Sequence, residues 1–147
     1  YYCSIGIVSN KKTITLCASA SHYKPMLKIA SQLRKLGFHV AIPLGAHHVQ
    51  PKTWNTNPAH YRKKMQLIRH HFNKIKKGDA VLITNYKKRG YKGYIGGNVL
   101  MEMALAFALR KKIYILNQPD DALPIKEEIY GVLPVFINGD LSRIAAH

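Results

Sequence analysis

Apolar runs rich in β-branched residues alternate with helix-like patterns along most of the chain. We expect strands at 13–17, 38–42, 80–84, 112–116 and 135–137, and helices at about 25–36, 59–77, 99–110, 125–130 and 140–146. This alternation is typical of α/β proteins with a parallel sheet covered on both faces. The sequence therefore predicts a five-stranded parallel sheet with helices on both faces, a flavodoxin/Rossmann-like three-layer sandwich.

We assign residues 13–147 to this single domain, and 1–12 to an N-terminal extension that the pattern does not explain. Open sheets of this kind bind ligands beyond the carboxyl ends of their strands, where the strand order reverses. We therefore expect a ligand site among the loops that follow Cys17, Ile42 and Thr84.

The chain is strongly basic, with 23 Lys and Arg against 7 Asp and Glu, a formal net charge of +16. Such a field attracts polyanions and phosphorylated small molecules, so nucleotides and nucleic acids are candidate partners. No apolar run approaches the roughly 20 residues of a membrane helix. No secretory signal is visible, and Cys3 and Cys17 form no disulfide framework. We expect a cytoplasmic protein without a membrane partner.

Glu102 is the one charged residue in the helical stretch 99–109, where ten of eleven residues are apolar. A helix that is apolar on every side is expected to be buried. Burial of an unpaired carboxylate is costly and raises its pKa, and such a group at the ligand end of a sheet is a candidate for catalysis. A capping box does not fit well. It requires Glu or Gln three residues after the N-cap, but the expected N-cap is Asn98 and the third residue after it is Met101. Stabilisation of the carboxylate by the helix dipole remains an alternative.

The segments that carry a family resemblance read GDAVLIT, GGNVLMEMALAFALRKKIYIL, TLCASASHYKPM and LRKLGFHV. Over roughly residues 13–117 the chain resembles the nucleoside 2-deoxyribosyltransferase-like superfamily, which includes 2'-deoxynucleoside 5'-monophosphate N-glycosidases. The resemblance implies a nucleoside or nucleotide substrate, a homo-oligomer, and Glu102 as the nucleophile that attacks the anomeric carbon. It also implies that Asp79 lies near the nucleobase and assists its departure.

The resemblance further implies that the loop after the first strand contacts sugar or phosphate through Ser19, Ser21 and Tyr23. Substrate contacts are also expected on both sides of the next glycine-rich loop, at Asn85, Gly96, Gly97 and Asn98. The glycines do not form a dinucleotide fingerprint or a P-loop.

The same loop departs from the family pattern, because it has neither the transferases' additional acid nor the glycosidases' serine. It has four cations instead, which either hold a phosphate or form a solvated loop: Lys87, Lys88, Arg89 and Lys92. Hydrolysis and transfer therefore both stay open.

The histidines, among them His47, His48, His60, His70 and His71, show no metal-binding spacing. We expect structural or surface roles for them, no metal and no cofactor. Trp54 and His48 either stack on a base or anchor their loop.

Two further functions remain open. The charge favours a non-catalytic nucleotide-sensing or nucleic-acid-binding domain on the same fold, and the basic helix 59–77 is either a solvated face or a nucleic-acid contact. A lysine-decarboxylase-like phosphoribohydrolase shares the architecture, but its Gly-Gly-x-Gly-Thr pattern is absent.

Overall fold

The structure, a computed structural model, describes residues 10–44 and 58–145. Five strands alternate with helices, as expected from the sequence. The strands are β1 (Thr13–Cys17), β2 (His39–Ala41), β3 (Ala80–Ile83), β4 (Lys112–Ile115) and β5 (Val135–Phe136). The helices are the 3-10 turn η1 (Ala20–His22), α1 (Tyr23–Lys35), α2 (Pro58–Lys77), α3 (Gly97–Ala108), α4 (Lys126–Gly131) and α5 (Ser142–Ala145).

The strands form one parallel sheet in the order β2-β1-β3-β4-β5. In the register between the two central strands, Ile14 pairs with Ala80 and Cys17 pairs with Ile83. The chain moves to one side of β1 to form β2 and to the other side to form β3, so the strand order reverses at this pair. A flavodoxin-like order of this type places its ligand site at the carboxyl ends of these two strands.

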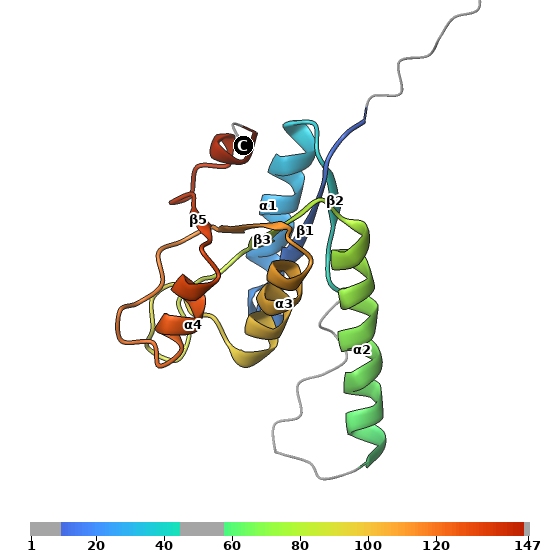
Figure 1. The fold of residues 1–147 in the computed structure, drawn as a ribbon, viewed down its shortest axis with the longest axis vertical. Helices are drawn as coiled ribbons and strands as arrows, with labels where there is room; N and C mark the ends of the chain where they lie inside the picture. The colour runs from blue at the N-terminus through green and yellow to red at the C-terminus, as the bar shows by residue number, and fades with distance from the viewer. Residues whose placement is uncertain (1–9, 45–57, 146–147) are drawn as a thin grey trace, which may run out of the picture.

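Helices cover both faces of the sheet, which confirms the predicted three-layer α/β architecture (Figure 1). One apolar core joins α1 and α5 to the first face, with Met26, Leu33 and Ile144 packed against Leu16 and Leu82. The other core lies beneath α2, α3 and α4 and contains Ile75, Met103, Ile129, Val81 and Ile115. The central strands are therefore apolar on both sides.

The carboxyl end of α2 is tied to the sheet by two lysines. Lys111, which precedes β4, donates to the carbonyl oxygens of Ile75 (2.8 Å), Lys76 (2.6 Å) and Gly78. A cation at this position satisfies carbonyls that have no partner within the helix. Lys74 donates to the Ile42 carbonyl over 2.6 Å. These contacts hold the last turns of α2 beside the start of β4 and the end of β2.

Two packing expectations are wrong. Although α3 is apolar on all sides, Met101 and Phe107 are 43% and 52% exposed. In an outer layer only one side of a helix faces the sheet, so an apolar sequence does not enforce burial all round. In α2 the apolar residues at helical spacing predict a buried stripe of Met65, Leu67, Ile68, Phe72 and Ile75, but only Ile75 is fully buried and Met65 is exposed.

None of the described helices combines the length and apolar character required to cross a membrane.

Candidate active site

A pocket of about 310 Å³ lies beyond the carboxyl ends of β1 and β3, where the strand order reverses. Its walls come from the loop after β1, the middle of α2, the loop after β3 and the first turns of α3. The residues that line it include Ser19, Tyr23, Pro43, Lys64, Leu67, Ile68, His71, Lys88, Tyr94, Gly96, Gly97, Asn98 and Glu102. The site expected from the topology is therefore present as a cavity.

Glu102 enters the pocket from the second turn of α3. The helix begins at Gly97 with Gly96 as its N-cap, and its first turn contains no acidic residue, so Glu102 does not belong to a capping box. Asn98, one turn earlier, donates from Nδ2 to Glu102 Oε1 over 3.4 Å. The other carboxylate oxygen, Oε2, is buried and has no hydrogen-bond partner among the described residues.

Burial raises the pKa of Glu102 to about 7, because desolvation outweighs the nearby Cys17 thiol and the Lys64 ammonium, which lower it. Its side chain is 7% exposed. Among the described residues that line the pocket, Glu102 is the only carboxylate. A carboxylate that titrates near neutral pH beside a cavity is a candidate for covalent or acid–base chemistry.

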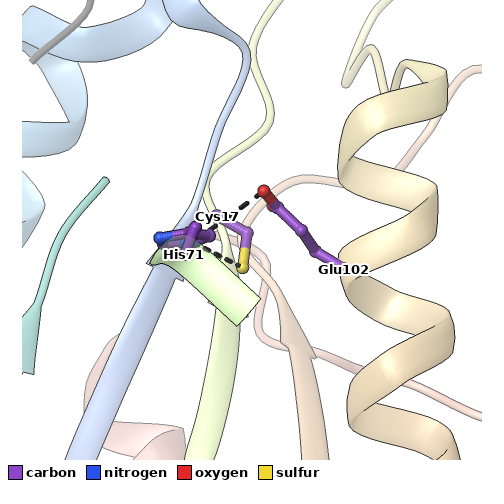
Figure 2. A group of neighbouring side chains, drawn as sticks. All are labelled: Cys17, His71 and Glu102. Carbon is purple, nitrogen blue, oxygen red and sulfur yellow. Dashed lines mark hydrogen bonds and ion pairs between the residues drawn. The ribbon is translucent and has the colours of Figure 1, made fainter. Parts of the chain in front are cut away.

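Two neighbours of Glu102 come from other elements. His71, on α2, lies with Nε2 3.9 Å from Glu102 Oε1, and Cys17, at the end of β1, lies with Sγ 3.6 Å from the same Nε2. Figure 2 shows the three side chains directed toward one another from β1, α2 and α3. Burial lowers the pKa of His71 to about 4 and raises that of the Cys17 thiol, so both side chains are neutral at pH 7.

The sequence predicts a structural or surface role for His71, and the structure places it, buried, at the wall of the pocket. His71 lies three residues after Ile68 and four before Ile75, the spacing of one helix face. Ile68 lines the pocket and Ile75 is in the core. The helical periodicity of α2 therefore carried a signal that His71 faces inward.

Two lysines, Lys88 and Lys64 of α2, also line the pocket. Lys88 donates from Nζ to the Ser19 hydroxyl over 2.6 Å, and this Nζ lies 5.7 Å from the centre of the Tyr94 ring. Of the four basic residues expected in the loop after β3, Lys88 reaches the cavity, whereas Lys87, Arg89 and Lys92 are exposed outside its lining.

Ser19, Tyr23, Gly96, Gly97, Asn98 and Glu102 are thus brought together as the sequence indicated. Asp79 is not, because it precedes β3 at the amino end of the sheet, opposite the pocket, where its carboxylate accepts a hydrogen bond from the Thr13 amide (2.7 Å). That position does not agree with a role at the nucleobase.

Asn85 and Ser21 also lie outside the pocket lining. Asn85 is buried, donates from Nδ2 to the carbonyls of Gly93 (3.0 Å) and Asn117 (2.7 Å), and accepts at Oδ1 from the Asn117 amide (3.0 Å). Its side chain joins the loops after β3 and β4 and has no free group for a substrate. Ser21 is exposed, and its hydroxyl lies 3.3 Å from that of Ser19. His47, His48 and Trp54 lie outside the described residues.

The fold and the pocket define an α/β protein of flavodoxin-like strand order with a buried acid at its ligand-binding edge. No protein-family model matches the chain, and no curated protein matches it in sequence. Its structure is similar to that of the CMP N-glycosidase BcmB from Clostridium botulinum, with a TM-score of 0.51, 16% identity, and coverage of 86% of this chain and 87% of the other.

A second similar structure is the 2-deoxyribosyltransferase from Bacillus psychrosaccharolyticus, with a TM-score of 0.50, 17% identity and coverage of 70% of each chain. Both proteins belong to the nucleoside deoxyribosyltransferase-like superfamily. The resemblance predicted from the sequence is therefore confirmed at the level of the fold.

Proposed function

We propose that this chain cleaves or transfers the N-glycosidic bond of a nucleoside 5'-monophosphate, with Glu102 as the nucleophile. The observation that carries the proposal is the Glu102 carboxylate itself, which is the only one lining the described pocket and has a buried Oε2 without a partner. Two similar solved structures are a 2-deoxyribosyltransferase and a CMP N-glycosidase, which supports the same bond as the target.

The chemistry follows that of a retaining glycosidase. A Glu102 oxygen forms a bond to the anomeric carbon while the bond from that carbon to the base nitrogen breaks. The base leaves with the bonding electron pair and takes up a proton. Water then displaces the sugar from Glu102, or a second base does so, and the carboxylate is restored. A negative carboxylate also stabilises the oxocarbenium-like charge that develops in each step.

The two lysines of the pocket support a phosphorylated substrate. Lys88 and Lys64 line the same cavity as Glu102, and Ser19, which accepts the hydrogen bond from Lys88, stands at the start of η1. A phosphate oxygen in place of the Ser19 acceptor would make a charge-assisted hydrogen bond with Lys88, stronger than one between neutral groups. The cavity, at about 310 Å³, is at the small end of the range for ligand pockets.

The test is incubation of the purified protein with a panel of nucleosides and nucleoside 5'-monophosphates, followed by chromatography for free base. We expect release from a 5'-monophosphate. Addition of a second base distinguishes transfer, which yields a new nucleotide, from hydrolysis. Absence of release from every compound in the panel would contradict the proposed activity.

A second candidate, a non-catalytic nucleotide-sensing or nucleic-acid-binding domain, is favoured by the net charge of +16. Many basic residues of α2 are exposed, namely Arg62, Lys63, Arg69, Lys76 and Lys77. Binding through these residues predicts an affinity for oligonucleotides that falls steeply with salt. The absence of any binding at low salt would exclude the nucleic-acid form.

We also propose that the protein forms a homo-oligomer. The exposed side chains of Met101 and Phe107 lie on the outer surface of α3, close in sequence to the catalytic carboxylate. Large exposed apolar patches often mark protein–protein interaction sites. Sedimentation equilibrium provides the test, and a monomer at micromolar concentration would contradict the proposal.

A further inference from the structure

The mechanism above uses Glu102 but leaves Cys17 and His71 without a role. All three side chains are buried, and their ligand atoms (one thiol sulfur, one imidazole nitrogen and one carboxylate oxygen) lie within 4.8 Å of one another. They come from β1, α2 and α3, elements that are far apart in the sequence (Figure 2). The fold therefore brings three different metal-ligating groups together at one buried point.

The geometry is close to that of a tetrahedral metal site. With ordinary Zn–S, Zn–N and Zn–O lengths, two ligand atoms of a tetrahedral zinc ion are separated by roughly 3.3 to 3.6 Å. The distance from Cys17 Sγ to His71 Nε2 is 3.6 Å, and that from the same Nε2 to Glu102 Oε1 is 3.9 Å. The third pair, Cys17 Sγ and the Glu102 carboxylate, lies within 4.8 Å, so the carboxylate must move toward His71 and the thiol to share one ion with them.

Two further features favour a cation here. Glu102 Oε2 is buried and makes no hydrogen bond within the described part of the chain, so the carboxylate has an oxygen to give. His71 and Glu102 line the pocket, which provides the fourth coordination position for water, as in three-ligand zinc sites. Lys64 and Lys74 act against a cation, but a thiolate and a carboxylate together supply two negative charges, enough to balance Zn²⁺.

We propose that Cys17, His71 and Glu102 form a binding site for a thiophilic divalent cation of the Zn²⁺ class, and that metal occupancy and turnover exclude each other. Binding forms bonds from the metal to the Cys17 thiolate, the neutral His71 imidazole and the Glu102 carboxylate, and the thiol proton passes to solvent. The exclusion of turnover rests on the proposed function, because coordination draws the negative charge of the Glu102 carboxylate to the metal and places the ion between this carboxylate and His71 at the pocket wall. The metal site itself does not depend on the proposed function.

The binding test uses the full chain under reducing conditions, titrated with Co²⁺ as a spectroscopic substitute for Zn²⁺. We expect a thiolate-to-cobalt charge-transfer band that saturates at one equivalent. The band should disappear in Cys17→Ser, or in Cys17→Ala if the serine variant does not fold, and should persist in the matched control Cys3→Ser. A band that is absent from the wild type, or that depends on Cys3, would overturn the site.

A competition assay with a chromophoric chelator gives the Zn²⁺ affinity. Because loss of a direct ligand costs at least as much as loss of an outer-shell partner, we expect His71→Asn to lower the affinity by roughly tenfold or more. His70→Asn is the matched control, since His70 is the exposed neighbour on the same helix. Equal affinities in the two variants would overturn the assignment of His71.

The effect on turnover is measured as the ratio of base release with and without Zn²⁺, within each variant. We expect inhibition of the wild type and at least a tenfold shift of the inhibitory Zn²⁺ concentration in Cys17→Ser, in keeping with the loss of a ligand. Equal inhibition of the wild type and of Cys17→Ser would show that Zn²⁺ does not inhibit through this site, and would overturn the proposal that metal binding excludes turnover. If metal-free wild type releases no base while the cobalt band is present, the proposed function fails and the metal site stands.

Discussion

His71 Nε2 lies 3.9 Å from Glu102 Oε1, and burial shifts the pKa values of the two residues in opposite directions. The pKa of His71 falls to about 4 and that of Glu102 rises to about 7, in each case toward the neutral form. The pair is therefore held without charge in moderately acidic solution, and Glu102 acquires its negative charge only as the pH approaches neutrality.

This relationship predicts how Glu102→Gln changes stability. A carboxyl with a raised pKa stabilises the fold fully below its unfolded pKa, 4.5, and loses that contribution as the pH rises through about 7. From pH 4 to pH 8 the variant should therefore gain about 3 kcal/mol of unfolding free energy relative to wild type. Urea unfolding of the wild type and the variant at both pH values measures this difference. His71 is present in both proteins, so its contribution cancels. If the unfolding free energies of the wild type and the variant change equally with pH, Glu102 is not buried as described.

The same pKa sets the pH dependence of the reaction. Since the nucleophile must be ionised, kcat/KM for base release should rise with pH and level off above about 7. A phosphate titrates near pH 6 by itself, so the profile is best compared between a 5'-monophosphate and the corresponding nucleoside. A common inflection near neutrality supports Glu102 as its source, whereas a rate that falls over this range would count against an ionised carboxylate.

Lys88 should distinguish phosphorylated from unphosphorylated substrates. Removal of its ammonium in Lys88→Ala should lower kcat/KM for the 5'-monophosphate by roughly 10- to 100-fold, the value of a hydrogen bond to a charged group, with little effect on the nucleoside. Lys92→Ala removes the same charge from the exposed part of the loop and serves as the control. An equal loss for both substrates would argue against phosphate binding at Lys88.

Gly93 should be intolerant of a side chain, because its φ is +52° and a Cβ would lie 2.5 Å from the Gln118 carbonyl oxygen and 2.9 Å from Asn85 Nδ2. We expect Gly93→Ala to cost about 1 to 3 kcal/mol through backbone strain and the displaced Asn85. Gly97→Ala is the control, since a Cβ at this helix start meets nothing within 4 Å. Thermal unfolding compares them, and equal melting temperatures would refute this account of the loop.

The architecture could be predicted because it depends on local patterns. Strand β1 has the bounds expected from its β-branched run, and Glu102 stands out because a single charge interrupts an apolar helix. The direction of the strands then places the loops after β1 and β3 at one edge, where Ser19 and Gly96 do line the pocket.

The errors concern contacts that depend on tertiary structure. Asp79 precedes β3, so strand direction alone places it away from the ligand edge, yet the family resemblance suggested otherwise. Asn85 is committed to Gly93 and Asn117, 32 residues away in the second case, and no local pattern reveals such a bond. The approach of Cys17 to Glu102 depends on the packing of α3 with α2, β3 and β4, which periodicity does not specify.

The measurement that tests the central claim most directly is base release by Glu102→Gln beside the wild type, on the substrate identified from the panel and at matched purity. The amide keeps the size of the side chain and relieves the burial of a charge, so the variant should be folded. Without a nucleophile, we expect kcat/KM to fall by roughly a thousandfold or more. An unchanged rate in a folded Glu102→Gln variant would contradict the assignment of Glu102 as the nucleophile.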